Sequence, residues 1–388
     1  MSAPADRSGG ARRRSFAVGV GVLVVLGGVW ASSALGGGGG AAPSQPGVTA
    51  PSPTPPPGGI SLPSLHGRIV YAASVPGSPG LRERLFVYDL DDETIAPGPR
   101  TPTIDELADV DGDRLVMVGD GEEGERVAYV VPDLGANRTA REVARGRVVE
   151  PSPDGRFLLI VNDRPRGCVG PGYELQQKEL LPNVRFAAEA SSRDGCGTVI
   201  SAATTSTRAA FTVIDRRDRA TVVLGPGVGA GGDLRFAPAF EGLAVMSVSP
   251  TGSFLFTDAP TPADARVPPT GPLLVWQGHG QPRTVAEGFR ATRVLSWMPG
   301  GGIAVVNGTL EGQRAMWLVN MATGTTVPIL PSNRFDLGTA FSGATFDRAG
   351  NAFGASAGVI VVSGRSGTFP LPFPPDAPTP LGPIVWLP

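Results

Sequence analysis

Residues 147–161 read RVVEPSPDGRFLLIV, and this stretch contains the pattern that decides the fold. A short apolar segment leads into the turn sequence SPDG at 152–155, and the strongly apolar segment Arg156–Val161 follows it. Proline presets the first corner of a type I turn, aspartate binds backbone amides, and glycine accepts the left-handed conformation that closes a hairpin. The stretch therefore predicts two antiparallel strands, the second of them apolar on both faces.

The same unit recurs along the chain after His66. Ser192–Gly195 precedes an apolar segment at 198–202, and Ser249–Gly252 precedes another at 253–257. Weaker copies complete a series of marker glycines, at positions 67, 112, 155, 195, 252, 301 and 350, which lie 45, 43, 40, 57, 49 and 49 residues apart. Such periods, with about four short strands in each unit, are typical of β-propellers. We predict an all-β closed propeller of about seven four-stranded blades, with no sustained helical periodicity in this region.

The SPDG turns resemble the WD40-like (PD40) β-propeller repeats of TolB-type proteins of the bacterial cell envelope and of some peptidase propeller domains. The resemblance covers residues 66–388 as a repeat pattern, and Ser152–Gly155 matches the signature in full. The Gly-His and Trp-Asp pair of eukaryotic WD40 repeats is absent. The resemblance implies a propeller that acts as a binding scaffold, and it implies no catalytic residue.

The two ends of the repeat region indicate how the ring closes. The first unit begins abruptly at Gly67–Tyr71, and the chain ends with the isolated apolar segment Gly382–Leu387. A circular fold closes when its last strand completes its first sheet. We therefore expect Ile384–Leu387 to form the innermost strand of the first blade.

The N-terminal region divides into three parts ahead of the propeller at 64–388. Residues 1–14 form a basic segment that we expect to be cytoplasmic, and 15–35 form a charge-free run of 21 residues. At about 1.5 Å per residue, such a run spans a bilayer core of about 30 Å as a helix. Residues 36–63 are rich in glycine and proline and lack the apolar side chains needed for a core, so they predict a disordered tether.

The apolar run permits two interpretations. It is either an uncleaved single-pass anchor or a signal peptide cut near Ala34, after the small residues Ser32 and Ser33. The basic flank predicts a propeller outside the cytoplasm in both cases. The sequence RRSFA at 13–17 also fits twin-arginine export, which leaves the export route open.

Two cysteines, Cys168 and Cys196, are the only ones in the chain. Export leads to an oxidising compartment, and each cysteine has glycine beside it, which lets the backbone adapt to a bridge. We predict a Cys168–Cys196 disulfide that joins the loop leaving the third unit to the turn of the fourth, across adjacent blades.

Candidate sites for chemistry are few. With only His66 and His279 in the chain, most metal and nucleophile arrangements are excluded, and Gly354–Gly358 fits a nucleophile elbow in letters but precedes a strand. Asp109, Asp111 and Asp113 surround a turn and are weak candidates for calcium. Paired-carboxylate hydrolysis stays open, because the sequence does not show which acids converge.

These observations favour a non-enzymatic binding or scaffolding module for a protein or cell-envelope ligand, with no cofactor. A net charge of −2 gives no indication of nucleic-acid binding. Two long loops, 163–182 and 259–270, are the expected recognition elements, and the weak binding candidates Arg164, Arg166, Tyr173 and Gln176 lie in the first. The alternative is a propeller hydrolase or lyase that uses carboxylates, with or without a metal.

Overall fold

The computed structural model describes most of the chain from Leu65 onward: residues 65–75, 83–112, 114–122, 124–135, 138–164, 167–181, 185–186, 191–227, 236–260, 270–331, 343–356, 359–364, 367–371, 374, 377–380 and 382–388. Contacts between residues divide the chain after Gly58, and every described residue belongs to the second unit, 59–388. The predicted segments 1–14 and 15–35 and the predicted tether 36–63 lie outside the described residues. Among the described residues, no helix is long and apolar enough to cross a membrane.

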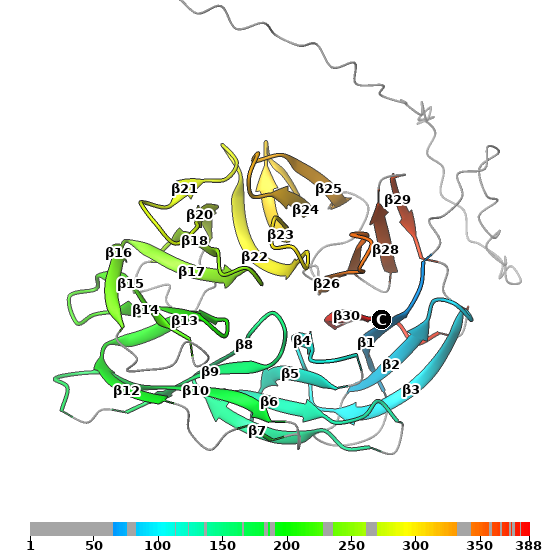
Figure 1. The fold of residues 1–388 in the computed structure, drawn as a ribbon, viewed down its shortest axis with the longest axis horizontal. Coiled ribbons are helices and arrows are strands. Elements are labelled where there is room, and N and C mark those ends of the chain that lie inside the picture. Colours follow the sequence, from blue (N-terminus) through cyan, green and yellow to red (C-terminus); the bar gives the residue numbers. More distant parts are fainter. Residues whose placement is uncertain are drawn as a thin grey trace, which may run out of the picture. The chain divides into compact units, whose positions relative to one another are not determined.

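Seven antiparallel sheets follow one another around a ring (Figure 1), which confirms the predicted seven-bladed propeller. From the centre outward, the first blade contains β30 (Ile384–Leu387), β1 (Arg68–Ser74), β2 (Glu83–Asp89) and β3 (Thr94–Thr101). The second contains β4 (Glu106–Asp109), β5 (Leu115–Asp120), β6 (Arg126–Val131) and β7 (Arg141–Gly146). The third contains β8 (Val148–Pro151), β9 (Phe157–Asp163) and β10 (Gly172–Leu181), with β11 (Arg185–Phe186) and β12 (Ser191–Cys196) both paired to β10.

The remaining blades have the same antiparallel order. The fourth contains β13 (Thr198–Thr204), β14 (Arg208–Ile214), β15 (Ala220–Pro226) and β16 (Ala237–Glu241). The fifth contains β17 (Leu243–Val248), β18 (Phe254–Asp258), β20 (Leu274–Trp276) and β21 (Arg283–Thr284). The sixth contains β22 (Arg290–Trp297), β23 (Ile303–Leu310), β24 (Gln313–Asn320) and β25 (Thr326–Pro331), with β19 (Gly271–Pro272) paired to β22. The seventh contains β26 (Gly343–Phe346), β27 (Ala352–Ser356), β28 (Val359–Gly364) and β29 (Gly367–Pro370), so the GASAG sequence at 354–358 runs from one strand toward the next strand of a hairpin.

The repeated turn joins the innermost strand of a blade to its second strand. In the third blade, the amide of Gly155 donates to the carbonyl of Ser152 at 2.8 Å, and the amide of Phe157 donates to Ser152 Oγ at 3.0 Å. Ser249 and Gly252 make the equivalent backbone contact at 2.9 Å in the fifth blade. Gly155 and Gly252 have φ of 63° and 84°, the left-handed conformation that the sequence pattern predicted.

The interpretation of Gly195 as the turn glycine of the fourth unit was wrong. Ser192–Gly195 belongs to β12, the outer strand of the third blade, and Gly195 pairs with Tyr173 of β10. The glycine is needed there for close packing, because a Cβ at Gly195 would lie 2.3 Å from the Tyr173 ring. The tight turn of the fourth blade lies between β13 and β14, at residues 205–207, and contains no glycine.

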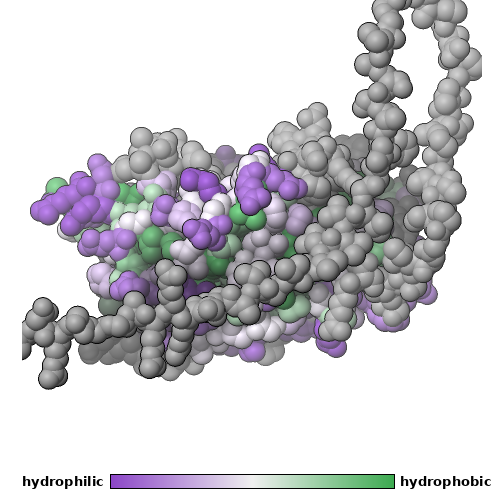
Figure 2. All heavy atoms as spheres, turned by 90° about the horizontal axis from the view of Figure 1, so that it is seen from above, coloured by the Kyte–Doolittle hydropathy of each residue, from purple (hydrophilic) through white to green (hydrophobic). Residues whose placement is uncertain are grey.

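The hydrophobic core lies between the blades. Seven clusters of buried side chains occur in the described structure, each formed by two adjacent blades. The cluster around Tyr71 and Phe353 joins the first blade to the seventh and thereby completes the circle. Figure 2 shows hydrophilic side chains standing out from the surface, with hydrophobic ones set between them. A strand that contacts a neighbouring blade on each face must be apolar on both, which explains the continuous apolar runs in the sequence.

Strand β30 closes the ring as predicted. It pairs antiparallel with β1, with Val385 opposite Val70 and Leu387 opposite Arg68. The amide of Trp386 donates to Thr345 Oγ1 of β26 at 3.0 Å, which binds the same strand to the seventh blade. The last residues of the chain therefore hold together its first and last complete units.

Candidate functional site

The antiparallel order of the strands gives the propeller two different faces. We call the face on which the innermost strands end the turn face, since it carries the tight turns such as Ser152–Gly155. We call the opposite face the loop face; there the innermost strands begin, and the loops between second and third strands lie beside them. The seven innermost strands β4, β8, β13, β17, β22, β26 and β30 lie around the centre of the ring (Figure 1), and we call the region that they enclose the central channel.

Charged side chains from three blades converge in this channel toward the loop face. Arg293 of β22, in the sixth blade, donates from Nη2 to the backbone carbonyl of Asp105 at 2.9 Å. The same nitrogen lies 3.7 Å from Glu106 Oε1 of β4, in the second blade. An arginine from one side of the ring thus contacts the innermost strand on the other side. We call Asp105, Glu106, Arg126, Glu150 and Arg293 the channel cluster.

Arg126, at the start of β6, holds most of the acids in this cluster. Its two Nη atoms donate to the Asp105 carboxylate at 2.6 and 2.8 Å, and further contacts reach Asp120 at 2.8 Å and Glu106 at 3.3 Å. Burial alone would lower the pKa of Arg126, but these carboxylates outweigh it and raise that pKa. Arg126 therefore stays charged, and Asp105 and Glu106 are committed to ion pairs.

Glu150 of β8 is different, because it has no such partner. Among the described residues, no hydrogen-bond donor or cation lies within bonding distance of its carboxylate. Burial raises its pKa well above the ordinary value, and the negative charge of Glu106 raises it further, against the opposing effect of Arg126 and Arg293. Burial also raises the pKa of Glu106, which Arg293 opposes. Glu150 is thus the carboxyl of the cluster best placed to keep a proton.

The channel cluster was not predicted, although the sequence contains a signal for it. In β8, Val149 is buried in the core, while Val148 and Glu150 are partly exposed on the other face of the strand. An acid that alternates with a buried residue on an innermost strand lies on the other face of that strand, next to the centre of the ring. Sequence alone could not place Glu150 near Arg293, because that requires the diameter and closure of the ring.

A groove of about 690 Å³ lies on the loop face between the third and fourth blades. We call it the disulfide groove; it is formed by Val169, Pro171, Cys196, Gly197, Thr198 and residues 214–219. The apolar side chain of Val169 is 83% exposed. Arg219 pairs with Asp215 at 2.9 Å, whereas the exposed Arg216 and Arg217 have no carboxylate within 4 Å in the described structure.

The predicted Cys168–Cys196 disulfide is present, with the two Cα atoms 5.5 Å apart. It does not join adjacent blades as expected. Both cysteines belong to the third blade, because Cys196 ends its outer strand β12 and Cys168 lies between β9 and β10. The bond therefore fixes the loop that carries Val169 to the edge of its own blade, and it forms one wall of the disulfide groove.

The prediction of one long loop at 163–182 is wrong, because β10 occupies half of that range. Tyr173 is 7% exposed and packs edge-on against Phe211 at 5.5 Å, and Gln176 is half-buried within the strand. Arg164 pairs with Glu174 at 2.5 Å. Arg166, and residues 261–269 of the second expected loop, lie outside the described residues. The three described candidates are thus parts of a sheet and its ion pairs.

The candidate calcium ligands take part in the turn between β4 and β5. Asp109 accepts the amide of Gly112 at 2.7 Å, and Asp111 accepts from Arg114 Nε at 2.8 Å; Asp113 lies outside the described residues. Within the described part of the chain, no group of three His, Cys, Asp or Glu side chains could hold a metal ion. His66 is bound to Asp91 at 2.6 Å, and His279 is exposed in its turn.

The geometry above defines a class of protein, a closed seven-bladed β-propeller with one charged channel. No protein-family model matches the sequence, and no curated protein matches it. Solved structures match the fold. The β-propeller domain of the Trilobed protease from Pyrococcus furiosus has a TM-score of 0.52 at 11% identity, over 81% of this chain and 97% of that one. That domain is described as having an open velcro topology, whereas here β30 pairs with β1.

Two further solved structures are similar to this chain. Acylaminoacyl peptidase from Pyrococcus horikoshii matches with a TM-score of 0.51 at 12% identity, over 80% of this chain and 52% of that one. TolB from Acinetobacter baumannii matches with a TM-score of 0.46 at 15% identity, over 83% and 67%. At identities of 11–15%, the likeness to these structures concerns the fold alone.

Proposed function

We propose that this chain is an extracytoplasmic binding module, attached to a membrane or exported across it by residues 15–35, that presents its loop face to a protein or cell-envelope ligand. The observation that supports this proposal best is the disulfide groove. It combines an exposed apolar side chain, Val169, with two cations, Arg216 and Arg217, that have no carboxylate partner among the described residues. A ligand that carries acidic groups beside an apolar group complements this surface.

The construction of the groove suits recognition. Arginine binds carboxylates and phosphates through two parallel hydrogen bonds, and cations at a rim accelerate the approach of an acidic partner. The Cys168–Cys196 bond holds the loop in place before the ligand arrives. A preformed surface loses less conformational entropy on binding, so more of the interaction free energy contributes to affinity.

Site-specific photo-crosslinking in native envelopes tests this proposal. A photo-reactive amino acid at position 217 is expected to give a discrete adduct, while the same amino acid at Arg348, exposed on the turn face, is expected to give none. The double charge reversal R216E/R217E, with the photo-reactive group moved to Val169, is expected to abolish the adduct, and R348E is expected to leave it unchanged. Equal adducts from both faces, or an adduct that survives the double reversal, would refute the proposal.

A carboxylate-based hydrolase or lyase is the second candidate, and the unpaired Glu150 is the observation that favours it. A carboxyl that keeps its proton beside a second acid, Glu106, is suited to general acid catalysis. Activity on a panel of glycosides and acidic polysaccharides, lost in E150Q but kept in E241Q at an exposed position, would support this function. Elemental analysis of the purified protein would show whether a metal accompanies it.

A further inference from the structure

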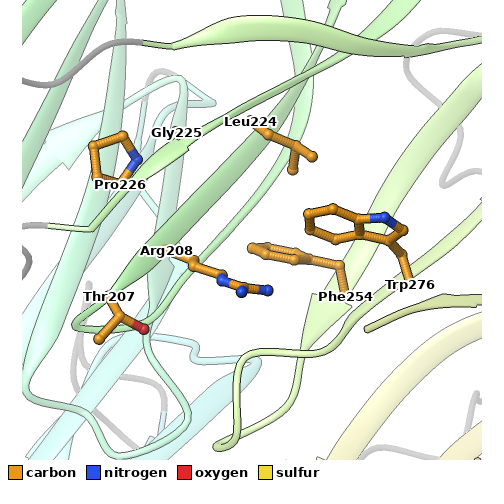
Figure 3. Close-up of a pocket in the computed structure, with 7 residues that line it drawn as sticks. All are labelled: Thr207, Arg208, Leu224, Gly225, Pro226, Phe254 and Trp276. Carbon is orange, nitrogen blue, oxygen red and sulfur yellow. The ribbon is translucent and has the colours of Figure 1, made fainter. Parts of the chain in front are cut away.

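A second pocket lies on the turn face, between the fourth and fifth blades, and nothing above assigns it a role. It has a volume of about 330 Å³ and is lined by Thr207, Arg208, Leu224, Gly225, Pro226, Phe254 and Trp276. Figure 3 shows the guanidinium of Arg208 extending toward Phe254 and Trp276, with Leu224, Gly225 and Pro226 forming the other side. The volume falls in the lower part of the range of small-molecule sites.

The guanidinium of Arg208 is held in place without being neutralised. It lies over the Trp276 ring, 5.5 Å from the ring centroid, and its Nη1 donates to the carbonyl of Gly252 at a long 3.5 Å. No carboxylate of the described residues lies within 4 Å of this half-buried cation, although the other arginines of the channel and of blade edges are mostly paired. Four of its five N–H donors therefore have no partner in the described structure.

The surrounding backbone is shaped around this cation. Thr205 Oγ1 accepts the amide of Arg208 at 3.2 Å and fixes the start of β14. Gly278, with φ of 100°, is in van der Waals range of the guanidinium, and a Cβ at this position would lie 2.5 Å from Nη1. Trp276 Nε1 donates to the carbonyl of Gly280 at 3.1 Å, which orients the indole ring. Turns from two blades thus hold one cation against one aromatic wall.

We propose that this pocket binds a small ligand in which a carboxylate is attached to, or lies next to, an aromatic ring. The carboxylate accepts hydrogen bonds from the free guanidinium donors, with the Thr207 hydroxyl at the rim as a further donor. The ring packs against the partly exposed Trp276, which the fully buried Phe254 supports from behind with its ring centroid 6.3 Å away. The proposal concerns the face opposite the disulfide groove and does not depend on the function proposed for that groove.

Calorimetric titration of the full-length chain in detergent tests this site with phenylacetate as the probe. We expect saturable binding of phenylacetate, with acetate and phenylacetamide at least about tenfold weaker, because each lacks one of the two recognised groups. R208Q is expected to lower the affinity for phenylacetate by about tenfold or more. R348Q, at an exposed arginine on the same face, is expected to leave that affinity unchanged.

A second variant separates loss of the site from loss of the fold. Thr207 is exposed at the rim, so T207W blocks the pocket without removing a buried contact. We expect T207W to melt at the wild-type temperature and to lose phenylacetate binding. Failure of the wild-type protein to bind at 20 mM (about the weakest affinity that titration measures), equal binding of phenylacetamide, or unchanged binding in T207W would each overturn the proposal.

Discussion

Arg293 of the sixth blade donates a hydrogen bond of 2.9 Å to the backbone carbonyl of Asp105 in the second blade, although 188 residues separate the two in the chain. This contact crosses the central channel and lies next to Glu106 and Glu150. Both acids experience the positive charge of Arg293, which lowers the pKa that burial raises. The contact therefore couples the closure of the ring to the protonation of its channel.

Replacement of Arg293 with methionine is expected to destabilise the protein by about 1 kcal/mol. A hydrogen bond from a charged donor contributes about 1.5–3 kcal/mol, and the partial exposure of this side chain reduces that value. The loss should be larger at pH 8 than at pH 5, because the acids left without the cation are then ionised. Denaturant unfolding at the two pH values measures both effects. R290M, on the same strand at an exposed position, is the control, and an equal loss at both pH values would contradict the coupling.

Glu150 should make the wild-type protein less stable as the pH rises. Burial raises its pKa above the ordinary 4.5, so the folded state binds this proton more tightly than the unfolded state does. Stability then falls as pH increases from about 4.5 through the raised folded pKa, and the loss is complete above it. E150Q is expected to match wild type at pH 4, to melt at a higher temperature at pH 8, and to have a flatter pH profile between. Parallel melting profiles for E150Q and wild type would show that this carboxyl has no raised pKa.

Strand β30 should contribute strongly to stability. Leu387 is fully buried in the cluster between the first and second blades, so L387A is expected to lower the free energy of unfolding by about 2–5 kcal/mol. V327A, at a residue that is 48% exposed, should change stability by less than about 0.5 kcal/mol. Deletion of residues 383–388 should expose the edge of β1, remove the contact of Trp386 with Thr345 of β26, and promote aggregation. Cooperative unfolding of the deletion at an unchanged temperature would disprove closure by β30.

The Cys168–Cys196 bond should contribute about 3–4 kcal/mol, because it closes a loop across a sequence separation of 28. The double variant C168S/C196S is expected to lose that amount in denaturant unfolding and to show faster amide exchange near Val169, the exposed wall of the disulfide groove. Thiol counting on denatured, unreduced protein from fresh envelopes is the direct check. Two free thiols would mean that the bond does not form in the cell.

The proposed topology predicts the behaviour of the chain in intact spheroplasts. Protease added from outside is expected to release a folded fragment that begins between residues 36 and 63, because the propeller is expected outside the membrane. N-terminal sequencing of the fragment gives the boundary. A chain that is protected until the spheroplasts are lysed would place the propeller in the cytoplasm and contradict the proposal.

The sequence predicted the fold well because its determinants are local and repeated. The tight turns of the third and fifth blades need a left-handed residue, so glycine recurs at Gly155 and Gly252, and each strand between blades needs apolar side chains on both faces. The prediction failed in the third and fourth blades for an equally physical reason. Gly195 is required by the ring of Tyr173, and a glycine kept for close packing cannot be distinguished in sequence from one kept for a turn.

By itself, then, the sequence determined the blade repeat, the closing strand and the disulfide. The repeat and the closing strand follow from local motifs, and each cysteine has only one other cysteine in the chain with which it could pair. The tertiary structure decided which charges meet. Glu150 is one acid among 35 acidic residues, and it acquires its neighbours only when the second, third and sixth blades surround one channel. The placement of Arg208 against Trp276 likewise depends on two adjacent blades. Contacts between residues far apart in the chain are set by ring geometry, which no local pattern encodes.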